Sequence, residues 1–311
     1  MNYTKISLDD ETFISDKSVA CIGYFDGLHL GHQVLIEKCI IESKIRGCKS
    51  KMITFSPDPW AVIKEDVNIK NITPLNKRIK LAKQLGIDDV IVVDFTKQLS
   101  LLGPQVFISK IIEPCNLAVL ICGFDFHFGY QGSGDINFLK EYTTKSFELL
   151  TVDEIKFNSL KISSTRITKF IEDGHIKDAN VLLGYTYNIE GRVIYGKQKG
   201  TLIGFPTANI EINENYVIPK NGVYQGLIEI DNIKYKAMIN VGHNPTINYI
   251  KEISIEAHIL DFNENIYSKN VSLYFLEYLR EEKKFESVDL LIDQLNKDKI
   301  NVIENFRGTN I

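Results

Sequence analysis

The stretch GYFDGLHLGH, residues 23–32, places two histidines, His29 and His32, three residues apart. It lies between the apolar run SVACI and a helical pattern, which predicts a turn from a strand into a helix. Glycines let the backbone approach a ligand there, and the free N–H groups of a helix start favour an anion. Imidazoles at i and i+3 can face that anion together and stabilise charge that builds up at phosphorus.

Two other interpretations of this histidine pair stay open. Together with Asp26, the two imidazoles could bind a metal ion, although no third ligand stands at an obvious spacing. They could also be ordinary polar surface near a helix start. From the residues alone, handling of a nucleotide phosphate is one hypothesis among three.

A second group of candidate residues lies in GKQKGTLIGFPTANI, residues 196–210. Gly204 permits a close-packed loop, Pro206 stiffens it, and Thr207 and Asn209 point to the same side if the segment is extended. A hydroxyl and an amide carbonyl are hard oxygen ligands that suit Mg²⁺, which typically bridges substrate phosphates. A turn held by threonine and asparagine hydrogen bonds would have the same sequence.

The first half of the chain must supply a strand before the histidines and a helix after them. Short apolar runs alternate there with amphipathic helical patterns: SVACIG, SKMITF, DVIVVDF, LAVLICG and FELLTV. Strands that alternate with helices predict βαβ units, and therefore a Rossmann-like parallel sheet covered on both faces. Sites in such sheets lie beyond the carboxyl ends of the strands.

The second half changes period after the helical segments SSTRITKFIEDG and HIKDANVLLG. Apolar and polar residues then alternate, a hairpin is expected around Asp231-Asn232, and a final helical pattern follows. We expect a small antiparallel β-barrel with a closing helix. The boundary is expected near 184–187, which gives domains 1–184 and 185–311.

Composition excludes some classes of partner. The 311 residues carry a formal charge of −4, so no overall basic surplus would hold nucleic acid or a membrane surface. Five cysteines without a CxxC pair suit a reducing compartment. With no apolar stretch of membrane-spanning length and no basic, apolar leader, we expect a cytoplasmic protein, a monomer or weak homo-oligomer.

The motifs of the first half resemble a known family. GYFDGLHLGH resembles the HxGH signature of nucleotidyltransferases, in the form shown by prokaryotic bifunctional riboflavin kinase/FAD synthetases, and TFSPDPWAVI, CGFDFHFGYQGSGD and ISSTRI resemble that family's further loops in order. The resemblance implies that both histidines contact ATP phosphates. It also implies nucleotide, flavin or phosphate contacts for Gly23, Phe25, Asp26, Gly31, Asp125, Ser164, Thr165 and Arg166. From the residues alone, SST could equally be an N-cap signal, and Arg166 could equally be a solvated helix charge.

The second half resembles the riboflavin kinase part of the same family. GFPTAN matches the kinase signature, and INVGHNPT, IEAHILDFNENIY and LREEKKFESVDLL follow in the family's order. The resemblance implies that Thr207 and Asn209 bind Mg²⁺ with ATP, and that Glu256 takes the proton from the ribityl hydroxyl of riboflavin. Since Glu256 alternates with Ile255 and Ala257, it points away from their face, and a solvent-facing strand glutamate is the alternative.

Three positions depart from the family pattern: Asp58 stands where histidine is usual, Thr168 where arginine is usual, and Thr201 where a basic residue is usual. The first two remove positive charge from a site for a polyanion. The resemblance implies a bifunctional enzyme that makes FMN and then FAD. The alternative is a riboflavin kinase whose N-terminal module binds nucleotide or flavin but is catalytically weakened; another HxGH transferase, such as a cytidylyltransferase, would leave GFPTAN unexplained.

Overall fold

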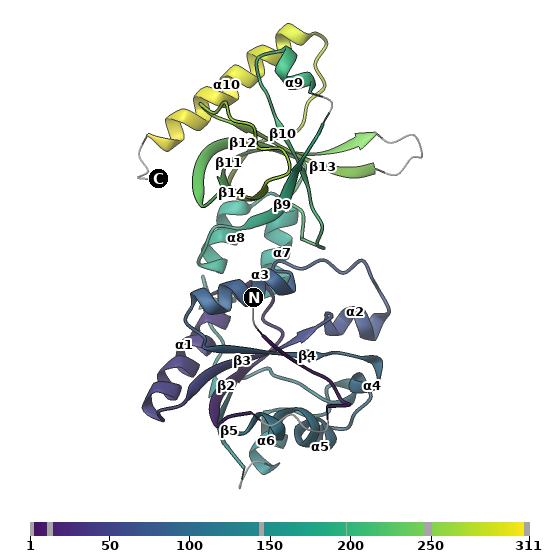
Figure 1. The fold of residues 1–311 in the computed structure, drawn as a ribbon, viewed down its shortest axis with the longest axis vertical. Helices are drawn as coiled ribbons and strands as arrows, with labels where there is room; N and C mark the ends of the chain where they lie inside the picture. Colours follow the sequence, from purple (N-terminus) through teal and green to yellow (C-terminus); the bar gives the residue numbers. More distant parts are fainter. Residues whose placement is uncertain (1–2, 11–14, 143–145, 197, 246–250, 308–311) are drawn as a thin grey trace. The chain divides into compact units, whose positions relative to one another are not determined.

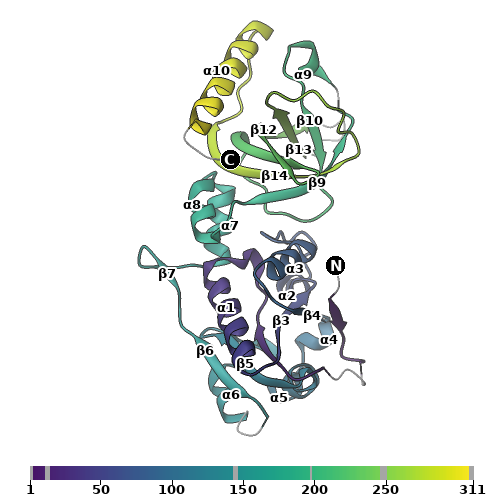
Figure 2. The same ribbon diagram turned by 60° about the vertical axis from the view of Figure 1, so that its left-hand side comes forward.

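The computed structural model describes residues 3–10, 15–142, 146–196, 198–245 and 251–307, and is drawn in Figures 1 and 2. The chain divides into two compact units, residues 1–164 and 165–311. No helix in the described ranges is long and apolar enough to cross a membrane. Each unit has its own sheet and its own core, and each is described by itself.

The first unit is built on a six-stranded sheet in which all neighbours are parallel. The strand order is β1-β4-β3-β2-β5-β6. The strands are β1 (Thr4–Ile6), β2 (Ser18–Ile22), β3 (Lys49–Ser56), β4 (Asp89–Asp94), β5 (Leu117–Gly123) and β6 (Glu148–Val152). The five predicted strands are therefore confirmed, and the short edge strand β1 was missed.

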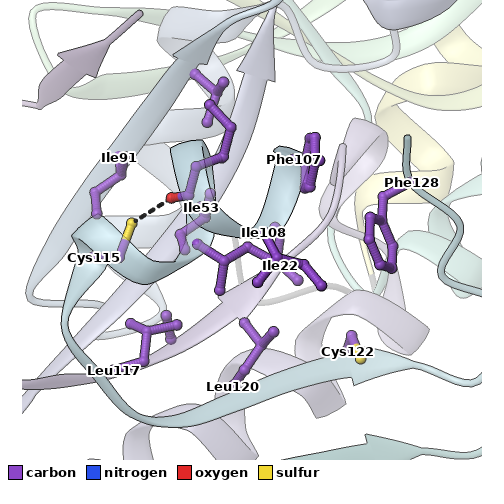
Figure 3. Packing of buried hydrophobic residues seen from close by; sticks show 14 of the residues in the cluster. Ile22, Ile53, Ile91, Phe107, Ile108, Cys115, Leu117, Leu120, Cys122 and Phe128 are labelled. Carbon is purple, nitrogen blue, oxygen red and sulfur yellow. Dashed lines mark hydrogen bonds between the residues drawn. The ribbon is translucent and has the colours of Figure 1, made fainter. Parts of the chain in front are cut away.

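Helices cover both faces of this sheet, as its continuous apolar strands require. On one face, α1 (Leu30–Ile45) and α3 (Leu75–Gln84) pack against alternate residues of β2, β3 and β4. On the other face lie α5 (Pro104–Phe107), a π-helical turn (Ile108–Ile112), a 3-10 turn (Glu113–Cys115) and α6 (Ile136–Tyr142). Figure 3 shows part of this second cluster, where the Cys115 thiol donates to a backbone carbonyl 3.1 Å away.

The parallel strands send their carboxyl ends to one edge of the sheet. The turn after β2, the short helices α2 (Pro59–Lys64) and α4 (Lys97–Ser100), and the loop after β5 all begin there. The hairpin of β7 (Lys156–Phe157) and β8 (Leu160–Lys161) follows β6. This is the edge at which a binding site is expected in such a sheet.

The second unit is a closed antiparallel barrel of strand order β10-β13-β12-β11-β14-β9. Its strands are β9 (Asn188–Ile194), β10 (Ala208–Glu211), β11 (Gly222–Ile230), β12 (Ile233–Pro245), β13 (Lys251–Ile259) and β14 (Asn270–Arg280). Asp231 and Asn232 both have positive φ, 51° and 66°, as a tight hairpin turn requires. The predicted barrel, its hairpin and its closing helix α10 (Val288–Phe306) are confirmed.

Two helices precede the barrel: α7 (Ser164–Glu172) and α8 (Ile176–Leu183). The second one is attached to the barrel through Asn180, whose amide donates to the Phe275 carbonyl at 2.9 Å and accepts from the Tyr187 backbone N–H at 2.7 Å. Leu182 and Leu183 are buried. The compact unit thus includes helices that precede the predicted boundary, and that boundary stays a prediction.

We expect a fragment of residues 165–311 to be more stable than one of residues 185–311. Loss of α8 would leave the Phe275 carbonyl and the Tyr187 N–H without their partner and would uncover apolar barrel surface, at a cost of about 2–4 kcal/mol. Urea unfolding of both fragments measures the difference. Equal free energies of unfolding would show that the barrel does not depend on this helix.

Candidate functional sites

The turn after β2 is anchored by the buried carboxylate of Asp26. This carboxylate accepts hydrogen bonds from the backbone N–H groups of Ile72 and Thr73, at 3.1 and 2.8 Å, and from the Thr73 hydroxyl at 3.1 Å. The Thr73 hydroxyl oxygen accepts from the Gly27 N–H at 2.7 Å. Burial raises the pKa of Asp26 above its ordinary value, while Arg78 and the Thr73 bonds act in the opposite direction. Asp26 therefore holds the turn in place.

The metal hypothesis for this turn finds no support. The Asp26 carboxylate already accepts three hydrogen bonds from residues 72–73. Within the described ranges, no three His, Cys, Asp or Glu residues are grouped as a metal site would need. The histidines are also not ordinary surface, because His29 is buried and His32 half-buried.

His29 and His32 lie together at the start of α1. His29 is the N-cap residue, and its Nδ1 accepts from the His32 backbone N–H at 3.3 Å. The two rings stack with centroids 3.7 Å apart and planes 13° from parallel, and Phe25 meets His32 edge-on. A Cβ on Gly31 would come within 3.2 Å of the His29 ring, so this position favours glycine. Because Nδ1 of His29 is an acceptor, its proton is on Nε2, which can donate to a ligand.

Both imidazoles are neutral at physiological pH. Burial lowers the pKa of His29 to about 4, and the Lys161 cation acts in the same direction. Burial also places the pKa of His32 well below its ordinary value, helped by His29, Arg78 and Lys161. The pair can therefore donate N–H hydrogen bonds to phosphate oxygens but carries no charge of its own.

A cavity of about 1230 Å³ opens at the carboxyl edge of the sheet, lined by Gly23, Phe25, His32 and Asp125 among others. Its walls also include Trp60, Phe95, Phe107, Phe126 and Phe128. The volume exceeds that of a typical small-molecule site, about 300–1000 Å³, so it can hold a large ligand. Trp60 is 60% exposed, which leaves an indole face available to a planar ring.

Lys161 is a charged residue of this site that the sequence analysis missed. It forms an ion pair with Asp125, and its ammonium lies 4.9 Å from the centre of the Phe124 ring. The hairpin that carries it packs near Gly31, where Ile155 lies 3.9 Å from the position of an added Cβ. The signal was the basic residue directly before ISST, which the quoted motif omitted.

Ser164 of the motif ISSTRI bonds to the turn after β2. Ser164 is the first residue of α7, and its hydroxyl donates to the Asp26 carbonyl at 2.8 Å, so it joins the turn after β2. Thr165 and Arg166 belong to the second unit, where Thr165 is exposed and the guanidinium of Arg166 lies 5.4 Å from the centre of the Phe170 ring. Their predicted phosphate contacts stay predictions.

The departures from the family pattern have different surroundings. Asp58 is the N-cap of α2, and its carboxylate accepts from the Trp60 N–H at 2.7 Å, so the acid stabilises the helix that carries the indole. Thr168 is half-buried on α7. Thr201 is exposed on the short helix α9 (Lys199–Leu202).

The second candidate site is a row of polar residues on the outer face of the barrel. Asn209 on β10 and Asn240 on β12 are the direct register partners of Glu256 on β13. The neighbours Ile255 and Ala257 are buried, at 2% and 0% exposure, so Glu256 points outward. The Thr207 hydroxyl donates to the Glu256 carboxylate at 3.0 Å. Two oxygen ligands suited to Mg²⁺ thus lie beside a carboxylate.

The loop before β10 closes over this row. A Cβ on Gly196 would lie 2.1 Å from the Asn209 amide nitrogen, so a larger residue there would require the Asn209 side chain to move. Gly204 has a φ of +81°, and the Pro206 carbonyl accepts from Nδ1 of His258 at 2.8 Å. The sequence analysis missed His258, although it lies two residues after Glu256 and so points to the same side of the strand.

Acid should destabilise the protein through His29. Its pKa is about 4 in the folded state and about 6.5 when unfolded, so the unfolded chain takes up the proton first as the pH falls. The contribution of His29 to the free energy of unfolding, on the order of 3 kcal/mol, is therefore fully present above pH 6.5 and is lost as the pH falls from about 6.5 to 4. His29→Asn keeps an N-cap but cannot titrate, so urea unfolding at pH 7.5 and 4.5 should show a smaller loss. An equal loss would contradict the assignment.

Comparisons with known proteins match both halves of the chain. A FAD synthetase family model matches residues 12–166, and a riboflavin kinase model matches residues 183–306. The bifunctional riboflavin kinase/FMN adenylyltransferase of Listeria monocytogenes is 38% identical over 94% of this chain and 93% of its own length. The Bacillus subtilis enzyme of the same name is 36% identical over 93% of each.

Among solved structures, a crystal structure from Streptococcus pneumoniae, described as a macrolide-efflux protein, has a TM-score of 0.88 at 32% identity. The match covers 95% of this chain and 97% of that one. It confirms the two-part fold, and the family that the motifs predicted is confirmed by the matches above. The chain belongs to the bifunctional riboflavin kinase/FMN adenylyltransferases, a family with kinase and nucleotidyltransferase activities.

Proposed function

We propose that this chain makes FMN and FAD in two steps at two sites. At the barrel, ATP donates its γ-phosphoryl group to riboflavin. In the first unit, FMN attacks a second ATP, and pyrophosphate leaves. The observation that carries the proposal is the neutral, stacked histidine pair at a helix start beside a large cavity. The same chain also contains the Thr207–Glu256 contact on the barrel. Incubation with riboflavin, ATP and magnesium should yield FMN first and FAD later.

Adenylyl transfer requires the FMN phosphate to attack the α-phosphorus of ATP. No covalent enzyme intermediate is needed, so the protein's part is to position two anions and to stabilise the charge of the transition state. N–H groups of His29, His32 and the start of α1 would donate to phosphate oxygens. Lys161 would add positive charge by exchanging its Asp125 partner for a phosphate.

The apolar end of the cavity suits the isoalloxazine ring. Trp60, Ile63, Leu101 and Tyr130 line the cavity and are each at least 44% exposed, so a ring placed against them would remove apolar surface from water. The phosphate of the same FMN would then lie toward His32. Binding of this kind places the attacking oxygen by contacts remote from the reaction.

Phosphorylation of riboflavin would use the polar row on the barrel. Glu256 is the base that would accept the proton of the ribityl hydroxyl, and the Thr207 hydroxyl holds its carboxylate in position. The oxygens of Thr207 and Asn209 are ligands that fit Mg²⁺, and Gly196 brings the loop backbone close to them. Bound with ATP, Mg²⁺ supplies charge neutralisation for the phosphates.

The comparisons support the bifunctional proposal and not a weakened N-terminal module. The relatives that match over both halves are named for both activities. Asp58 has a local role as the N-cap of α2, so its presence does not require a lost catalytic function. The cytoplasm stays our proposal for the compartment, supported by the five free cysteines, four of which are buried.

Replacement of both histidines by alanine should abolish FAD formation while FMN accumulates. The change removes both N–H donors from the anion site and leaves the barrel untouched. Flavins separated after reaction with riboflavin, ATP and magnesium give the two rates in one sample. FAD formation at the wild-type rate would show that His29 and His32 do not act on the phosphates.

Glu256→Gln should slow riboflavin phosphorylation by about 10² to 10⁴, the usual cost of a lost general base. Glutamine keeps the shape of the side chain and can still accept from Thr207, so folding and FAD formation from added FMN should stay near wild type. Glu211→Gln, on the same face of β10 two residues beyond Asn209, is the matched control and should change little. Equal, small effects would make Glu256 an ordinary strand glutamate.

A further inference from the structure

Arg78 on α3 is a buried cation that has no role in either of the two reactions described above. Its side chain is 2% exposed. Nη1 donates to the Thr54 hydroxyl at 3.0 Å and to the Phe55 carbonyl at 3.2 Å, and Nη2 to the Thr73 carbonyl at 3.4 Å. Nε is buried without a partner among the described residues. The guanidinium donates only to neutral oxygens, and the Asp26 carboxylate on which its charge acts is already bonded to residues 72–73. Burial of this charge is therefore costly, and its presence needs a reason.

The contacts of Arg78 join three segments of the first site. Its guanidinium lies 4.1 Å from the centre of the Tyr24 ring, in the turn after β2. Thr54, which it holds at the end of β3, donates to the Tyr24 carbonyl at 2.8 Å. Thr73, whose carbonyl it holds, supplies the bonds to Asp26. One side chain therefore braces the turn that leads into the histidines.

Arg78 also lies directly behind residues that line the cavity. Tyr24 and Phe55, which it contacts directly, line that cavity together with His32. His29 stacks on His32, and after the larger effect of burial the pKa of His32 is lowered by His29, by Arg78 on α3 and by Lys161 on β8. Arg78 is thus a fixed positive charge behind the wall where a polyanion would bind.

We propose that Arg78 is a positioning residue of adenylyl transfer. It holds the phosphate-binding turn against β3 and residues 72–73, and its buried charge favours phosphate in the cavity. The proposal rests on the proposed function of the first unit. It assigns a part in the reaction to α3, a helix that lies outside the four motifs of the first half.

Two substitutions separate the two roles. Arg78→Met removes the charge and the hydrogen bonds, and should lower the kcat of FAD formation by roughly 10²-fold, the scale expected when reacting groups are misplaced by an ångström. Arg78→Lys keeps the charge but not the planar fork, so it should recover part of that loss. Riboflavin phosphorylation on the barrel should stay unchanged in both. Lys83→Met, on the same helix and paired with Asp89 at 3.9 Å, is the control.

The titration of His32, followed by NMR of its ring protons, distinguishes this role from simple bracing. Loss of a nearby cation should raise the pKa of His32 in Arg78→Met toward its ordinary value, whereas Arg78→Lys should leave it low. If Arg78→Met does not fold, the lysine variant decides, and an unchanged kcat overturns the proposal. Equal kcat losses in both variants with unaltered titration also overturn it. A wild-type protein that makes no FAD would instead refute the proposed function, and the titration would still report on Arg78.

Discussion

The hydrogen bonds between the Asp26 carboxylate and residues 72–73 set the geometry of the first site. They fix a turn in which Phe25 and Gly27 both have positive φ, 60° and 79°, and which runs directly into the first turn of α1. The Asp26 carbonyl also accepts from Ser164, so the last residues of the unit close on the same turn. The stacked histidines owe their position to this turn, because His29 caps the helix that begins where the turn ends.

Burial of the histidines has a consequence for how charge is supplied. Stacking holds the two rings in one geometry, and the bond to the His32 N–H fixes the tautomer of His29, which favours hydrogen bonds to phosphate. Burial lowers the pKa of both histidines, so it also keeps them neutral. Positive charge must then come from elsewhere: from Lys161, which is paired with Asp125 of the cavity lining, and from Arg78, which contacts the lining residues Tyr24 and Phe55. The usual basic residues at positions 58 and 168 are absent, yet the site is not without cations.

The sequence predicted the parts of this molecule that depend on local pattern. The apolar pattern predicted five of the six strands of the sheet, the change of period predicted the barrel, and Asp231-Asn232 predicted its hairpin. Residues whose partners lie far along the chain were missed: Arg78 acts through Thr54 and Tyr24, and β1 pairs with β4. A buried arginine in an amphipathic helix resembles any surface arginine until the fold supplies its partners.

The residues of the two sites are brought together in different ways, and this decides how far each site could be predicted from the sequence. On the barrel, strand register brings Asn209 and Asn240 to either side of Glu256. The resemblance named Asn209 and Glu256, and the register of the three strands adds Asn240. In the first unit, the groups come from the ends of several parallel strands and from a hairpin beyond β6, so no single segment contains the site. Motifs recover the segments, but only packing around a buried carboxylate and a buried guanidinium sets the distances between them. We therefore expect positioning of the substrates in this unit to depend on side chains buried behind the turn as well as on those that line the cavity.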